Sequence, residues 1–312
     1  MIEAGRREQS RVQSAPVRHW SVGRAAAALD NQFFKVAAAP AFIVVAAVTL
    51  VPVLVAIGLS FTPYSSTNPR IAFIGLQNYA NALADAQLRT VLWNTVVFTG
   101  AAVILESSIG LGLALLLRRS FRGVGIFRTI YLVPLMVASI ASATAWRVLL
   151  NTGAGWVNYF LGLAHLPQPD WLASPQWAMP SVILADMWTG APVVAILLLA
   201  GLLGVAVEPA EQARVDGANP WQVFWYITFP AIRPVFAFAV LFRVVDLFRQ
   251  FPLFQIMTGG GPGLQTTVLN YYVYQNTFQF GKLGYGAALA FILVLMMAIP
   301  LVILFRVARS GD

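Results

Sequence analysis

The sequence contains no cysteine, which excludes disulfide bonds and thiolate metal sites. Its only histidines, His19 and His165, lie far apart and outside the spacing of a metal site. Charged residues are also scarce, at 10% of the 312 residues, whereas an average soluble domain has about 25%. So few charges cannot cover the surface of a water-soluble protein of this size. Because long uncharged apolar runs separate the remaining charges, the sequence indicates a protein whose main solvent is lipid.

The net charge of +8 does not point to nucleic acid, because basic residues in a membrane protein hold its loops in the cytoplasm. Residues 1–34 are polar and rich in arginine. They precede a long apolar segment instead of the short apolar segment and small-residue cleavage site of a signal peptide. We therefore expect residues 1–34 to form a cytoplasmic tail that is not cleaved.

Six segments are long and apolar enough to cross about 30 Å of hydrocarbon as helices. They are residues 35–61, 90–117, 126–150, 179–205, 234–257 and 285–308. Strands are disfavoured because these runs do not alternate and are too long for strands of a membrane barrel. The predicted fold class is an all-α polytopic membrane protein. Residues 35–308 form its six-helix transmembrane domain, and residues 309–312 form a short cytoplasmic end.

The distribution of lysine and arginine sets the expected orientation. With a cytoplasmic N-terminus, 14 basic residues fall on the cytoplasmic side and 3 on the outer side. Basic residues concentrate in cytoplasmic loops of membrane proteins. The sequence therefore predicts a multi-pass protein of the cell inner (cytoplasmic) membrane with both termini in the cytoplasm.

The predicted outer loops are residues 62–89, 151–178 and 258–284. The second is rich in aromatic side chains: Trp156, Tyr159, Phe160, Trp171 and Trp177. Such residues gather at membrane interfaces, and contact with an external partner is the alternative. The third contains three consecutive glycines, Gly259 to Gly261, but no Gly-Lys-Ser/Thr follows them, which excludes a phosphate-binding loop.

The longest polar cytoplasmic loop, residues 206–233, is predicted to form two short helices. Pro209 suits the first turn of one helix, and Gly217 suits a left-handed position at its end. Asn219 followed by Pro220 is typical of the start of the second helix. We expect that helix to end near Pro230, because proline clashes with the preceding turn. The loop offers no nucleophile or metal cluster, so its acidic residues are not interpreted as catalytic.

This loop resembles the EAA motif of permease subunits in ABC importers. The matching residues are Glu211, Ala213, Asp216, Gly217, Ala218, Ile227 and Pro230. Gln212 and Phe229 depart from the motif, at positions where the family prefers alanine and leucine. In that family the loop docks in a cleft of the cytoplasmic ATPase subunit and couples ATP use to movement of the transmembrane helices. The resemblance therefore assigns residues 206–233 as the ATPase-coupling loop.

Further segments resemble the carbohydrate-uptake branch of this family, which includes maltose and glycerol-phosphate permeases. They are Gly75-Leu76-Gln77-Asn78-Tyr79, Trp93-Asn94-Thr95, Phe127-Arg128-Thr129 and Thr258-Gly259-Gly260-Gly261-Pro262. The resemblance implies a permease subunit that moves a sugar or sugar-like solute (a disaccharide, polyol, amino sugar or glycerol phosphate) from an external binding protein into the cytoplasm. It implies a second homologous permease, two ATPase subunits and an external solute-binding protein as partners. The chain itself would be non-catalytic and would bind no cofactor or metal, with ATP and Mg on the partner ATPase. An ion-coupled secondary transporter is the alternative function.

Ionisable residues inside the predicted spans form a second candidate site. Arg243, Asp246 and Arg249 follow one another at i, i+3 spacing on one face of the fifth span, so that Asp246 can pair with either arginine. Glu106 and Asp186 are candidate partners from the second and fourth spans. Trp188, Phe248 and Gln250 offer the apolar and hydrogen-bonding groups that a sugar needs. An internal charge network that fixes helix packing and a lining of the translocation path both remain open for these residues.

Overall fold

The computed structural model describes residues 22–119 and 121–309. Most of the predicted N-terminal tail and residues 310–312 lie outside the described residues. Helix α1 (Val22–Ser60) begins twelve residues before the tail was expected to end, so residues 22–34 are helical. The chain divides into two compact units between Val55 and Ala56, and α1 crosses this boundary.

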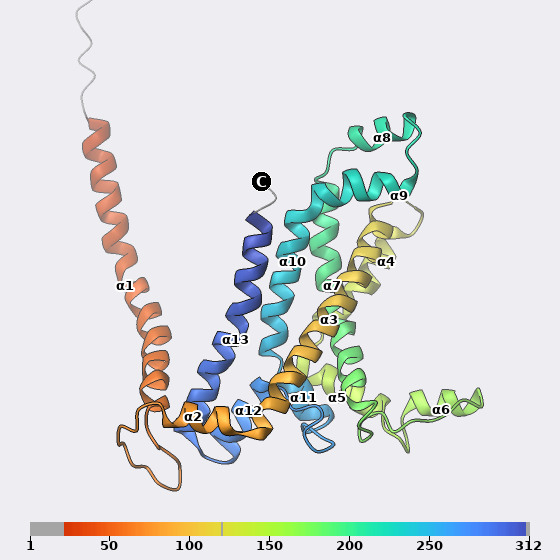
Figure 1. Cartoon of the computed structure of the whole chain (residues 1–312). Coiled ribbons are helices and arrows are strands. Elements are labelled where there is room, and N and C mark those ends of the chain that lie inside the picture. The colour runs from red at the N-terminus through yellow and green to blue at the C-terminus, as the bar shows by residue number, and fades with distance from the viewer. Residues whose placement is uncertain (1–21, 120, 310–312) are drawn as a thin grey trace, which may run out of the picture. The chain divides into compact units, whose positions relative to one another are not determined.

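The second unit is built from helices, and no β-strand occurs in the described part of the chain. Figure 1 shows the order of the elements. In sequence they are α2 (Gln77–Ala84), α3 (Ala86–Arg118), α4 (Val124–Leu132), η1 (Val133–Met136), α5 (Ser139–Leu149), α6 (Trp156–Leu163), α7 (Ala178–Leu203), α8 (Glu208–Val215), α9 (Pro220–Val223), η2 (Phe224–Thr228), α10 (Phe229–Arg249), α11 (Pro252–Met257), α12 (Leu269–Tyr274), η3 (Gln275–Gln279) and α13 (Leu283–Arg309). The all-helical class predicted from the sequence is confirmed.

Four helical segments in the described residues are long and apolar enough to cross a membrane: Ala39–Ser60, Ala86–Arg118, Ala178–Leu203 and Leu283–Ile303. A bent pair, Val124–Met136 and Ser139–Leu149, would make a fifth. Helix α10 is not among them, because it carries four ionisable residues, Arg233, Arg243, Asp246 and Arg249. The apolar runs therefore coincide with helices, while the expected number of six spans remains a prediction.

Two predicted spans differ from the structure in shape. The third, 126–150, is not one helix, because α4 continues into a 3-10 turn at Pro134 and α5 leaves at a bend of 99°. The fifth, 234–257, is shorter than predicted, because α10 ends at Arg249 and a separate helix, α11, begins at Pro252. In both cases a proline, which lacks the backbone N–H, lies at the start of the following helical segment. The hydropathy of the run does not record such a break.

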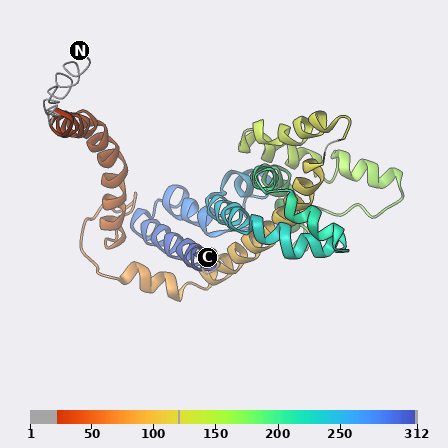
Figure 2. The same ribbon diagram turned by 90° about the horizontal axis from the view of Figure 1, so that it is seen from above.

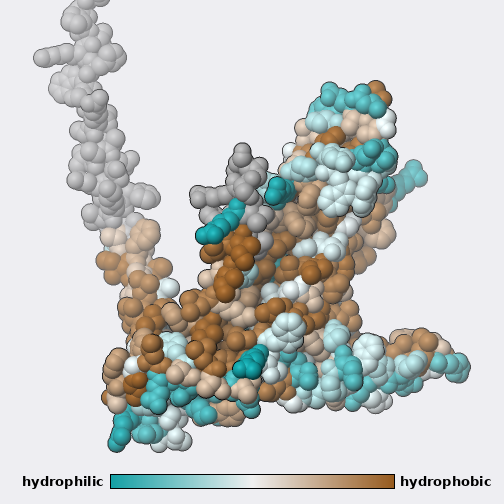
Figure 3. Space-filling model, in the orientation of Figure 1, coloured by the Kyte–Doolittle hydropathy of each residue, from teal (hydrophilic) through white to brown (hydrophobic). Residues whose placement is uncertain are grey.

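Helices α3, α7 and α10 pack against one another in the second unit, with α12 and α13 on one side of them and α4 and α5 on the other (Figure 2). One apolar cluster, near the ends of these helices that lie away from α8 and α9 (Figure 1), includes Phe98, Val182 and Phe254. A second apolar cluster, nearer their other ends, includes Ala114 and Leu198. In Figure 3 apolar side chains cover the middle of the second unit, and hydrophilic ones gather at its two ends. This banded surface is the one expected of helices embedded in lipid.

Candidate functional site

The polar loop after α7 folds into two short helices, α8 and α9, at one end of the second unit (Figure 1). Helix α8 has Pro209 at its second position and Glu208 and Glu211 in its first turn. Acidic side chains there interact favourably with the positive end of the helix dipole. Gly217 follows α8 with φ of +91°, as predicted. The Ala218 N–H donates to the Ala213 carbonyl at 2.8 Å and completes the end of the helix.

Helix α9 begins with a reciprocal pair of hydrogen bonds. The Gln222 N–H donates to the Asn219 side-chain oxygen, and the Asn219 N–H donates to the Gln222 side-chain oxygen, each at 2.9 Å. This capping box satisfies two backbone N–H groups at the start of α9 that have no partner within the helix. A hollow of about 400 Å³ lies between them. It is lined by Ala213, Asp216, Gly217, Ala218, Gln222, Val223, Tyr226 and Ile227.

We call residues 208–230 the knob. The structure brings five of the seven EAA-like residues together around its hollow, while Glu211 and Pro230 lie outside it. The knob's surface carries the large exposed side chains Val215, Trp221 and Tyr226, which are 87%, 69% and 80% exposed. A protruding element with an exposed apolar surface is suited to contact another protein.

The expectation that the second helix of the knob ends near Pro230 is wrong. Helix α9 continues through the π-helical segment η2 directly into α10, which has Pro230 in its first turn. In η2 the N–H of Phe229 bonds to the carbonyl of Phe224, one residue further back than in an α-helix. Proline is tolerated in the first turn of the following helix. The second helix of the knob, α9, is therefore continuous with α10 through η2.

Four ionisable residues of the predicted spans, Glu106, Asp186, Arg243 and Asp246, meet between the two apolar clusters. Arg243 Nε donates to Glu106 Oε2 at 2.6 Å, and Arg243 Nη2 donates to Glu106 Oε1 at 2.8 Å. Arg243 Nη2 also donates to Asp186 Oδ2 at 2.8 Å, and Nη1 pairs with Asp246. Arg243, Glu106 and Asp186 are 3%, 0% and 1% exposed, but the Asp246 side chain is 45% exposed. We call these four residues the buried ion cluster.

Two further features complete the cluster. Gln250 Nε2 donates to Asp186 Oδ1 at 2.7 Å, so the end of α10 is tied to α7. Gly190 provides the room, because a Cβ atom there would collide with the Glu106 carboxylate and the Arg243 guanidinium. The alternative pairing of Asp246 with Arg249 is absent among the described residues, and Arg249 is exposed. Glu106 and Asp186 satisfy Arg243 from two other helices, which sequence spacing within one helix does not reveal.

The aromatic residues near the cluster differ in accessibility. Trp188 is 38% exposed and makes an edge contact with Trp146, with ring centroids 6.4 Å apart. Phe248 is buried and packs inside the protein. Trp188, Asp246 and Gln250 therefore keep accessible surface, whereas Phe248 does not. No group of three or more metal-binding side chains occurs in the part of the chain that the structure describes.

Sequence reasoning missed a polar contact at the opposite end of the bundle from the knob. The Asp85 carboxylate caps α3 by accepting from the Gln87 N–H at 2.9 Å. It also accepts hydrogen bonds from the hydroxyls of Tyr272 at 2.7 Å and Tyr285 at 3.1 Å, so it joins α3, α12 and α13. An aspartate directly before an apolar helix is the signal that could have indicated it.

Burial and hydrogen bonding shift the pKa values of both Asp85 and Tyr272 in this contact. Partial burial would raise the pKa of Asp85, but the hydrogen bonds from Tyr272 and the Gln87 N–H outweigh it and lower the pKa below its ordinary value. Burial and the Asp85 carboxylate together raise the pKa of Tyr272 to about 12. Asp85 is therefore ionised and Tyr272 neutral at physiological pH.

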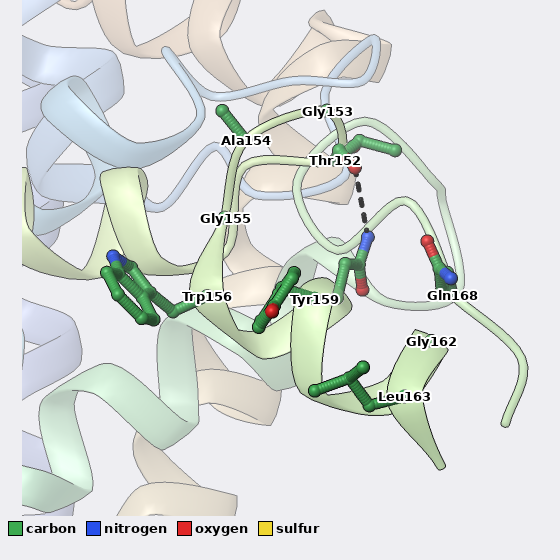
Figure 4. Close-up of a pocket in the computed structure, with 10 residues that line it drawn as sticks. Thr152, Gly153, Ala154, Gly155, Trp156, Tyr159, Gly162, Leu163 and Gln168 are labelled. Atoms are coloured by element: carbon green, nitrogen blue, oxygen red, sulfur yellow. Dashed lines mark hydrogen bonds between the residues drawn. The ribbon is translucent and has the colours of Figure 1, made fainter. Parts of the chain in front are cut away.

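The aromatic loop at residues 151–178, which is predicted to lie outside the cell, contains helix α6 and a shallow cavity of about 740 Å³ (Figure 4). Asn158 is buried under it and bonds to the carbonyls of Thr152 and Pro169 and to Trp171 Nε1. Trp156 and Tyr159 of α6 line the cavity and remain about 60% exposed. Both interpretations of these aromatics, a membrane interface and contact with an external partner, stay open.

Comparison with known proteins agrees with these features. The family model described as "Binding-protein-dependent transport system inner membrane component" matches residues 107–310. The chain is 34% identical over 263 residues to the trehalose/maltose transport system permease protein MalF of Thermococcus litoralis, which covers 83% of this chain and 89% of that relative. It is 33% identical over 275 residues to the sulfoquinovosyl glycerol transport system permease protein SmoG of Agrobacterium fabrum, covering 88% and 89%.

A third relative is the trehalose transport system permease protein SugA of Mycobacterium tuberculosis, 32% identical over 277 residues and 88% of each chain. Among solved structures, a bacterial ABC transporter that imports the acidic polysaccharide alginate superposes with a TM-score of 0.80 at 20% identity, over 92% of this chain and 99% of that chain. The same fold recurs in the alginate transporter bound to its periplasmic protein, with a TM-score of 0.79 at 20% identity, over 90% of this chain and 96% of that chain.

Proposed function

Because the chain belongs to the family of binding-protein-dependent transport system inner membrane components, we propose that it is the permease subunit of an ATP-driven importer for a sugar or sugar-like solute. The observation that carries the solute class is the group of relatives at 32–34% identity, which are permeases for trehalose, maltose and sulfoquinovosyl glycerol. The relatives and solved structures reported above are permeases or ABC transporters, which argues against the ion-coupled alternative.

The subunit acts with partners. The sequence has no ATP-binding motif, so ATP and Mg bind to a separate pair of ATPase subunits. A second, homologous permease completes the pathway, and an external binding protein delivers the solute. A binding screen on the cognate binding protein with disaccharides, polyols, amino sugars and glycerol phosphates would identify the solute. If that protein bound none of these, the proposed solute class would be wrong.

The proposal includes six spans with both termini in the cytoplasm. Helix α10 and the bent pair α4–α5 are added to the four apolar helices, because the buried ion cluster gives two charged residues of α10, Arg243 and Asp246, partners inside the protein. The C-terminal part of α13 lies at the same end of the second unit as the knob (Figure 1). A single cysteine at Ser310 should resist an impermeant thiol reagent in intact cells, and labelling there would overturn this orientation.

The knob is the element that docks on the ATPase. Its connection through η2 into α10 supports this role, since movement of the knob would be passed directly to the helix that carries Arg243. The shape of the knob requires glycine at position 217 because of the backbone conformation there, and not because neighbouring atoms crowd it. The φ of Gly217 is +91°, and a Cβ atom added at this position would have no neighbouring atom within 4 Å. A β-branched residue would therefore strain the turn without a steric clash elsewhere.

This geometry gives a matched pair of variants. Gly217→Val should insert in the membrane but lose solute uptake and the ATPase activity that loaded binding protein stimulates, because strain on the order of 1–3 kcal/mol distorts the turn. Gly217→Asn should keep both activities, since asparagine tolerates the left-handed region. Both are measured in reconstituted vesicles. Wild-type activities in an assembled Gly217→Val complex would show that this loop is not the coupling element.

Within the membrane, we assign different roles to the charged residues. Glu106, Asp186 and Arg243 are fully buried and fix helix packing, whereas Asp246, Gln250 and Trp188 keep accessible surface and line the solute path. Asp246→Asn should therefore leave protein abundance near wild type and raise the solute concentration needed for half-maximal uptake. Unchanged uptake kinetics would remove Asp246 from the path.

A further inference from the structure

The turn from α3 into α4 concentrates positive charge in a stretch of the sequence that has no acidic residue. Four arginines, Arg118, Arg119, Arg122 and Arg128, lie within eleven residues of one another. The sequence has no aspartate or glutamate between Glu106 and Asp170. The ion pairs found in the described residues all belong to Arg243, so none of these four arginines has one there.

Arg128 differs from the other three because it is used inside the protein. Its Nη2 donates to the carbonyl of Leu117 at 2.6 Å, and Leu117 is in the last turn of α3. A cation there satisfies an orphan carbonyl and the negative end of the helix dipole. We call the remaining three, Arg118, Arg119 and Arg122, the arginine corner. Arg119 and Arg122 are exposed, and Arg118 is half-buried.

An apolar surface adjoins the arginine corner. Phe121 and Phe127 contact each other with ring centroids 5.8 Å apart, and they are 38% and 58% exposed. Ile126 and Ile130 of α4 are 67% and 62% exposed. Helix α4 belongs to a bent pair that is apolar enough to cross a membrane, so this surface is of the kind that lipid covers.

We infer that the arginine corner binds the phosphate of an anionic phospholipid whose acyl chains lie along the exposed apolar face of α4. Guanidinium groups bind phosphate through paired hydrogen bonds, and basic clusters beside a membrane helix attract anionic headgroups. The general preference of cytoplasmic loops for basic residues explains why arginines lie at this end. It does not require three arginines without an ion pair among the described residues to lie beside an exposed apolar helix face, whereas a lipid with a charged head and apolar tails uses both.

The inference is independent of the transported solute and of the coupling role of the knob. A soluble anion would use the arginines but not the apolar face. The turn from α3 into α4 lies at the same end of the second unit as the knob (Figure 1), so an acidic surface of the proposed ATPase partner is a competing occupant. The experiment must therefore separate lipid from free phosphate and from protein.

The purified transporter complex in a neutral detergent would be titrated with phosphatidylglycerol or phosphatidylcholine. Bound lipid would be counted by native mass spectrometry, and the thermal midpoint would be recorded. Phosphatidylglycerol should bind and raise the midpoint, and phosphatidylcholine should not. The variant R118Q/R119Q/R122Q should bind phosphatidylglycerol roughly 100-fold more weakly, at about a fourfold to fivefold loss per arginine. The matched control R70Q/R89Q removes two exposed arginines far along the chain from the corner and should bind like wild type.

Several results would overturn the inference. They are equal binding of the two lipids, wild-type phosphatidylglycerol binding by the triple variant, or displacement of the lipid by millimolar inorganic phosphate. Loss of ATPase association with unchanged lipid binding would assign the corner to the protein partner instead. If the triple variant does not insert, Arg119→Gln and Arg122→Gln singly should each weaken phosphatidylglycerol binding, and R118K/R119K/R122K should retain it.

Discussion

Replacing Arg243 by methionine should be among the most damaging single changes in this protein. Methionine keeps much of the side-chain length but removes the charge, and it leaves two carboxylates, Glu106 and Asp186, at 0% and 1% exposure without their cation. Breaking a buried ion pair by removing one partner costs roughly 3–5 kcal/mol. At about 1.4 kcal/mol for each factor of ten, the ratio of folded to unfolded protein falls roughly 10²- to 4 × 10³-fold. The free energy of unfolding of a native protein is only about 5–15 kcal/mol in total.

The assay is the abundance of the assembled complex by fluorescence-detected size exclusion, together with its thermal midpoint. Arg243→Met should lose most of the assembled complex. The triple variant R243M/E106Q/D186N should recover much of it, because neutral groups replace all the fully buried charges. Arg249→Met, on the same helix but exposed, is the control and should match wild type. Wild-type abundance and midpoint in Arg243→Met would refute the claim that the buried ion cluster fixes helix packing.

Two further changes test the surroundings of these sites. Gly190→Ala should reduce the abundance of the assembled complex, because the added Cβ would collide with the buried ion cluster. Gly112→Ala is the matched control, because Gly112 has open space around it. Equal abundance of the two variants would contradict this packing. Asp85 has a pKa below its ordinary value of 3.8, so it contributes stability that is complete above that pH and is lost as the pH falls through the lower pKa of the folded state. The thermal midpoint of wild type should therefore fall more steeply below about pH 4 than that of Asp85→Asn, and parallel curves would remove this role.

The sequence was sufficient for the features that depend on local composition. Apolar runs located the long helices, and Gly217, Asn219 and Pro220 indicated the two helices of the knob, since turn and cap residues act on their immediate neighbours. The continuation past Pro230 was not predictable from the same rules. A π-helical segment shifts the hydrogen bonding just before that proline, and no local residue preference announces such a shift.

Contacts between helices were predictable only as candidates. Spacing placed Arg243, Asp246 and Arg249 on one helix face, but it could not decide which acid each arginine would meet. The structure resolves the choice with residues 57 and 137 positions away, Asp186 and Glu106. The contact of Asp85 with Tyr272 was missed for the same reason, because 187 residues separate the two side chains.

The positions of the knob and the buried ion cluster suggest how one helix serves two ends of the molecule. Helix α10 begins at the knob without a break and carries Arg243 and Asp246 close to its other end, which is at Arg249. The fully buried ion pairs of Arg243 tie this helix to α3 and α7. A displacement of the knob therefore cannot bend α10 freely at the cluster. It must either move the three helices together or break the buried ion pairs of Arg243. Breaking such a pair costs roughly 3–5 kcal/mol. Rigid movement of the group is the less costly response, and it would carry the exposed face of Asp246 with it.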